Sequence, residues 1–81
     1  MDQAMATLFE QLRLNWRAYF ILSELLFSLD EADDTLRDIH WDATPLLQIR
    51  PQILHYQRLL QVRIHRLHFR IIYQIQNRSL P

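Results

Sequence analysis

Two histidines in the second half of the chain have a spacing that metal sites use. His65 and His68 are three residues apart, so on a helix they project from one side and could share an ion with His55 or with a carboxylate. Histidine pairs at this spacing are far more often solvated or interfacial, so we predict no metal and no other cofactor. Protonating the pair would instead add charge to a segment that is already positive.

Three arginines beside these histidines could bind an anion. Arg63, Arg66 and Arg70 project within about 60° of one another on a helix, which would form a basic ridge suited to phosphates or to a carboxylate-rich surface. We expect the ridge to pair with the acidic residues of positions 24–42, within the fold or across a dimer. The alternative is a small nucleic-acid-binding regulator that uses this basic C-terminal helix.

The charged residues are divided unevenly along the chain. Residues 1–42 hold all nine carboxylates and three arginines, a net charge of −6, whereas residues 43–81 hold six arginines and no carboxylate, a net charge of +6. Such a division indicates either that the halves fold against each other or that the basic half has an acidic partner. The acidic cluster fits helix capping and solubility, and its functional alternative is the docking of a basic partner; the cluster comprises Asp30, Glu31, Asp33, Asp34, Asp38 and Asp42.

The composition argues against several classes of protein. Cysteine is absent, so no disulfide, zinc–thiolate site or catalytic thiol exists, and without glycine there is no phosphate-binding loop. The serines lack a nucleophile-elbow context, and we predict no enzyme activity. No apolar run has the length of a membrane span, since the longest is interrupted by Ser23 and Glu24. The N-terminus opens with Asp2 rather than a basic stretch, so we expect no signal peptide and a cytoplasmic location.

Residues 3–29 have the pattern of a long helix with two apolar sides. A projection at about 100° per residue gives one stripe interrupted only by Ser23, and a second stripe on the far side from Leu14 onward. The first stripe comprises Met5, Leu8, Phe9, Leu12, Trp16, Tyr19, Phe20, Leu26 and Phe27, and the second Leu14, Ala18, Ile21, Leu22, Leu25 and Leu29. One antiparallel helix covers only one stripe, so the second requires a third helix or another subunit.

A change of helix is predicted at residues 28–34. Ser28 and Asp30 are suitable N-caps, and acidic residues follow them, where the helix dipole favours negative charge. We therefore expect a separate short helix over about 31–41.

The clearest break in the chain is at residues 42–45. Thr44 can cap a helix, and Pro45 suits its first position because its missing N–H costs nothing there. We predict a last helix over about 45–76, with a break or kink at Pro51.

The segment 52–76 has the most regular apolar pattern. Seven apolar residues fall within about 100° of a helical projection, interrupted by Gln57 and Gln74; they are Ile53, Tyr56, Leu60, Ile64, Leu67, Ile71 and Ile75. The residues from Leu67 to Ile75 also alternate with period two, as in a strand. The run Phe69–Ile75 resembles the arginine–tyrosine strand of small toxins of the RelE and ParE type, which implies an α+β fold with a C-terminal strand at 66–76. Because the helical stripe is much longer than the alternation, we favour a helix.

These patterns predict one all-α domain over residues 1–81: a helical hairpin of two long antiparallel helices with a short connecting helix, completed by oligomerisation. The predicted function is a non-enzymatic protein–protein interaction module, such as a small adaptor, co-chaperone or inhibitor. Its partner is a helix of another protein or of a second copy. The predicted partner-binding residues are Leu14, Ile21, Leu22 and Leu25 for the apolar stripe, and Arg63, Arg66 and Arg70 for its charged rim.

Overall fold

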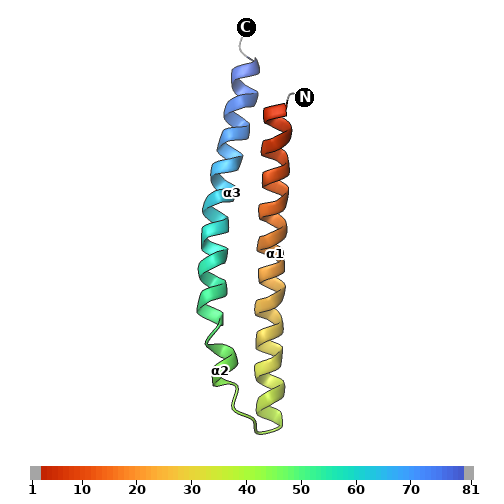
Figure 1. Cartoon of the computed structure of the whole chain (residues 1–81), viewed down its shortest axis with the longest axis vertical. Coiled ribbons are helices and arrows are strands. Elements are labelled where there is room, and N and C mark those ends of the chain that lie inside the picture. The colour runs from red at the N-terminus through yellow and green to blue at the C-terminus, as the bar shows by residue number, and fades with distance from the viewer. Residues whose placement is uncertain (1–2, 80–81) are drawn as a thin grey trace.

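The fold is a helical hairpin, as predicted. A computed structural model describes residues 3–79, in which α1 (Gln3–Asp38) and α3 (Arg50–Ser79) run antiparallel and the short helix α2 (Thr44–Leu47) lies in their connection (Figure 1). Residues 3–79 contain no strand, and positions 66–76 lie within α3. The alternative α+β fold is therefore wrong, because the long apolar periodicity outweighs nine alternating residues.

Helix α1 does not end at residues 28–34 but continues to Asp38, so the predicted separate helix over 31–41 does not exist. Serine and aspartate are good caps, but they do not stop a helix, and no glycine or proline occurs before Pro45. Within the continuous helix the Thr35 hydroxyl donates to the Glu31 carbonyl at 2.9 Å. The short connecting helix is formed instead by Thr44–Leu47.

A residue with positive φ follows the end of helix α1. His40 has a φ of 60°, its N–H donates to the Arg37 carbonyl at 3.0 Å, and the N–H of Trp41 donates to the Leu36 carbonyl at 2.9 Å. This pair of bonds is the Schellman arrangement, whose left-handed position is usually glycine. In a chain without glycine, a histidine occupies it at a conformational cost.

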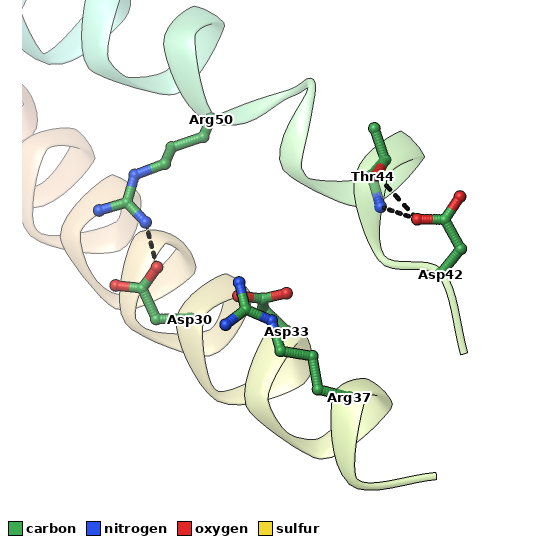
Figure 2. Close-up of polar contacts among 6 residues, drawn as sticks. All are labelled: Asp30, Asp33, Arg37, Asp42, Thr44 and Arg50. Atoms are coloured by element: carbon green, nitrogen blue, oxygen red, sulfur yellow. Dashed lines mark hydrogen bonds and ion pairs between the residues drawn. The ribbon is translucent and has the colours of Figure 1, made fainter. Parts of the chain in front are cut away.

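The connection is held by local polar contacts (Figure 2). The Asp42 carboxylate accepts from the Thr44 N–H at 3.0 Å and from the Thr44 hydroxyl at 2.7 Å, at the start of α2. The break before α3 lies at Gln48 and Ile49, so Pro51 stands in the first turn of α3, where a missing N–H is tolerated. The Arg50 guanidinium then binds the Asp30 carboxylate across the hairpin.

Burial along both helices follows alternating steps of three and four residues, the spacing of a two-stranded coiled coil. In α1 the buried and half-buried line consists of Met5, Leu8, Leu12, Asn15, Tyr19, Leu22, Leu26, Leu29, Asp33 and Leu36. In α3 it consists of Arg50, Ile53, Gln57, Leu60, Ile64, Leu67, Ile71 and Gln74. The core of the hairpin therefore lies along one heptad seam on each helix.

A polar layer crosses this seam near the middle of the hairpin. The Gln57 amide donates to the Ser23 hydroxyl at 2.7 Å and to the Tyr19 carbonyl at 3.4 Å, and the Gln61 amide donates to the Tyr19 hydroxyl at 3.2 Å. Ser23 and Gln57, each of which interrupts an apolar stripe in the sequence, thus bind each other. The two side-chain contacts, Gln57 with Ser23 and Gln61 with Tyr19, each join residues whose numbers add to 80, which defines the antiparallel register.

The core is thin for a chain of this composition. The hairpin measures 68 × 17 × 14 Å, and its radius of gyration is 18.8 Å, whereas a compact domain of this length has about 12 Å. Among residues 3–78, eight apolar residues are buried, none of them fully, and seventeen large apolar side chains are exposed. Two helices therefore leave much of the apolar surface of the described chain uncovered.

Candidate functional site

The side chains of α1 outside the seam form two apolar faces separated by charge. One face, which we call the aliphatic face, consists of Leu14, Ala18, Ile21 and Leu25; the other, the aromatic face, consists of Phe9, Trp16, Phe20 and Phe27. Opposite the seam, the residues at steps of seven from Glu10 to Asp38 are all charged: Glu10, Arg17, Glu24, Glu31 and Asp38. The heptad geometry places the aliphatic and aromatic faces on opposite sides of the hairpin.

The predicted partner-binding stripe lies on the aliphatic face, with one exception. Leu14, Ile21 and Leu25 are 48%, 52% and 42% exposed. Leu22 is half-buried and belongs to the heptad line that packs on α3, between Tyr19 and Leu26. Leu22 is therefore a hairpin residue and is not part of the exposed stripe.

The predicted basic ridge lies on the same side of the hairpin as the aliphatic face. Residues Arg63, Arg66 and Arg70 occupy α3 positions that flank the seam on this side, and all three are exposed. Among residues 3–79 none of the three forms an ion pair, so the expected pairing within the fold with positions 24–42 does not occur. The antiparallel register is the cause, since it sets these arginines opposite residues 10–17.

The folded hairpin has opposite charges at its two ends. The half nearest the connection, residues 24–56, holds seven carboxylates and two arginines, a net charge of −5. The other half, residues 3–23 with 57–79, holds one carboxylate and seven arginines, a net charge of +6. The uneven division along the sequence thus becomes a division along the length of a rod.

The aromatic face borders a large groove. The groove has a volume of about 620 Å³ and lies between the helices, lined by Trp16, Tyr19, Gln61, Ile64, His65, His68, Phe69 and Ile72. The rings of Trp16 and Phe20 stack with centroids 5.5 Å apart beside it. In the helical projection of the sequence these aromatic residues share one stripe with core residues such as Leu8 and Leu12, so this surface was not predicted; heptad spacing separates the two groups.

The histidine pair lines this groove, where His65 and His68 face Trp16 and Tyr19. Within the described part of the chain, no three histidine, cysteine or carboxylate side chains gather as a metal site requires. The groove can accept apolar groups, and its histidines add hydrogen-bonding atoms at the edge.

Two exposed carboxylates have shifted pKa values. The Arg13 guanidinium donates to both Glu10 oxygens, at 2.6 and 3.1 Å, and this pairing lowers the pKa of Glu10 and raises that of Arg13. The Thr44 hydroxyl, and then the Thr44 N–H, lower the pKa of Asp42. Both carboxylates are solvated and hold local structure, and neither is placed as a general acid or base in a pocket.

Comparisons with protein-family models, with curated proteins and with solved structures find no match to this chain. No helix within residues 3–79 combines the length and apolar character needed to cross a bilayer.

Proposed function

We propose that this protein is a non-enzymatic protein–protein interaction module, such as a small adaptor, co-chaperone or inhibitor, whose aliphatic face accepts a partner helix. The observation that carries the proposal is the exposure of Leu14, Ile21 and Leu25 on one side of a hairpin with a thin core. Contiguous exposed apolar surface on a small helical protein is typical of an interaction site.

The shape of the aliphatic face suits a helix. Its residues recur at steps of four, three and four, so they form a stripe about three turns long. Helix-in-groove recognition uses this spacing of apolar anchors. Burying a leucine or isoleucine completely is worth roughly 1.5–3 kcal/mol, so covering the exposed half of each of the three larger side chains contributes about 1 kcal/mol apiece.

The arginines beside the face supply its charged rim. Since Arg63, Arg66 and Arg70 have no ion-pair partner in residues 3–79, they are available to carboxylates on the incoming helix. Rim charges of this kind add little affinity, but they orient the partner and accelerate its association.

Site-specific photo-crosslinking tests the proposal. A benzophenone amino acid placed at Ile21 in cells that express the chain should give a discrete protein adduct, because the side chain would be covered by a partner. The same group at Asp34, an exposed acid outside the face, is the control. An equal yield from both positions, or no adduct from Ile21, contradicts an interaction through this face.

The unpaired arginines also support a second candidate, a small nucleic-acid-binding regulator. The basic half of the hairpin carries Arg58, Arg63, Arg66 and Arg70 on one helix without an ion pair in the described residues. A mobility-shift titration at two salt concentrations separates the candidates, because phosphate contacts make binding fall steeply with salt. Absence of binding at low salt excludes nucleic acid.

A further inference from the structure

We infer that the partner of the aliphatic face is a second copy of this chain, lying antiparallel to the first, so that two hairpins form a four-helix bundle. This inference depends on the proposed function, for which it names the partner. Three features carry it: the surface area of the hairpin, the charges of its two ends, and the order of residues along the face.

The hairpin exposes more surface than a monomer of its mass. Its accessible area is 6536 Å², whereas a folded monomeric protein of 9.9 kDa exposes about 5,200 Å². The excess of roughly 1,300 Å² is larger than the approximately 800 Å² that each partner buries in a standard interface. The excess is therefore large enough to supply a standard interface with one further hairpin.

The end charges select an antiparallel arrangement. Two rods side by side in opposite directions place the −5 half of each beside the +6 half of the other. A parallel arrangement instead places like charges side by side at both ends. The rod is 68 Å long, several times the screening length of about 8 Å at physiological salt, so the opposite charge at the far end does not offset this repulsion. Each basic ridge then lies level with the acidic half of the second copy.

The aliphatic face matches itself under the two-fold axis of such a dimer. With α1 antiparallel to α1 of the second copy, Leu14 faces Leu25 and Ala18 faces Ile21, and each pair occurs twice. The small Ala18 at the centre lets the helices approach. The charged residues opposite the seam flank the aliphatic face. In this register they set Arg17 of one copy opposite Glu24 of the other, and this pair also occurs twice.

The charged flank also distinguishes between the two faces. The aromatic face matches itself too, with Phe9 facing Phe27 and Trp16 facing Phe20. In that register, however, the flanking position sets Arg17 beside Arg17 of the second copy. In the aliphatic register the one pair of like charges is Glu10 with Glu31, and Glu10 is already bound to Arg13. The aliphatic face is therefore the one that a second copy covers.

A matched pair of substitutions tests the face. Ile21 and Phe20 are neighbours on α1 with similar exposure, 52% and 58%, but they lie on different faces. In sedimentation equilibrium of the full chain we expect a dimer whose dissociation constant rises at least about 100-fold in Ile21→Glu and changes less than about threefold in Phe20→Glu. Circular dichroism confirms that both variants stay helical. The opposite order of effects overturns the inference.

Charge exchange tests the orientation. Arg17→Glu and Glu24→Arg should each weaken self-association about tenfold, whereas an equimolar mixture of the two variants should form mainly the mixed dimer, because both flanking pairs are then attractive. Native mass spectrometry with one variant isotope-labelled measures the species. A statistical mixture contradicts the antiparallel pairing.

The proposed function has a separate outcome. If the wild-type chain sediments as a monomer at high micromolar concentration while the crosslinker at Ile21 captures a different protein, the second copy is excluded and the interaction module stands. If neither self-association nor an adduct is found, both fail.

Discussion

Replacing Gln57 with leucine is expected to raise the free energy of unfolding, and a double-mutant cycle with Ser23→Ala measures the coupling across the polar layer. Gln57 is only 9% exposed, and its amide donates to the Ser23 hydroxyl at 2.7 Å. The Ser23 hydroxyl keeps its own acceptor, the Tyr19 carbonyl at 3.1 Å, when the amide is removed. Gln57→Leu therefore strands no buried donor.

The magnitudes follow from burial and hydrogen bonding. A leucine at position 57 gains part of the roughly 1.5–3 kcal/mol of full burial and loses a bond worth about 1 kcal/mol, a net gain of about 1 kcal/mol. Ser23→Ala leaves the Gln57 amide with only the 3.4 Å contact to Tyr19, which costs about 1–2 kcal/mol. In the leucine background the same change should cost almost nothing, so the coupling is about 1–2 kcal/mol.

The assay is denaturant unfolding followed by circular dichroism, with all four proteins at one concentration because self-association raises apparent stability. Additivity of the two substitutions within about 0.5 kcal/mol refutes the polar layer as a coupled unit. The leucine variant should also populate shifted registers, seen as doubled amide signals in nuclear magnetic resonance spectra, since a buried polar pair penalises displacement of one helix along the other.

Three further substitutions probe the ends of the helices. His40→Gly should stabilise the hairpin by about 0.5–1 kcal/mol. Glycine removes the steric cost of the left-handed position, and the greater entropy it loses on folding offsets only part of that gain. Thermal unfolding measures the change, and a loss of stability refutes it. Asp33→Leu should stabilise by about 1–2 kcal/mol, because Asp33 Oδ1 is buried without a partner in the described structure, while the exposed Arg37 pair that is lost is worth less; a net loss of stability in denaturant unfolding would contradict this. Asp42→Asn tests a carboxylate whose pKa the Thr44 contacts lower: its advantage is present above the ordinary value of 3.8 and lost as pH falls through the lowered folded-state value, so the stability gap between wild type and variant should close in acid, and a gap that widens refutes the sign.

The hairpin and the core of its last helix were predictable because an apolar periodicity this long fits few structures other than a helix. Ile53, Ile64, Leu67 and Ile71 are all in the predicted stripe and all buried. The end of α1 was not predictable from capping residues, because aspartate and serine favour a helix start without preventing continuation. Contacts from outside the segment, such as Arg50 on Asp30, contribute to stabilising the helix there.

The division of α1 into faces failed for a geometric reason. A projection at 100° drifts about 20° per heptad from the spacing that two packed helices follow, which amounts to roughly 70° between residues 5 and 29. Because of this drift, the first predicted stripe includes Trp16, Phe20 and Phe27, which lie outside the seam, and omits Asn15 and Leu22, which lie in it. Near the start of α3 the same drift places Tyr56 in the predicted stripe, whereas Gln57 is the residue that is buried in the seam.

Thiol labelling tests most directly whether the aliphatic face is covered in solution. Because the chain contains no cysteine, Ile21→Cys and Phe20→Cys each carry a single thiol, at neighbouring positions of similar exposure in the hairpin. We predict that the thiol at 21 reacts at least about tenfold more slowly than the thiol at 20, and that dilution removes the difference as the complex dissociates. Equal labelling rates at high protein concentration would show an open aliphatic face and contradict the bundle.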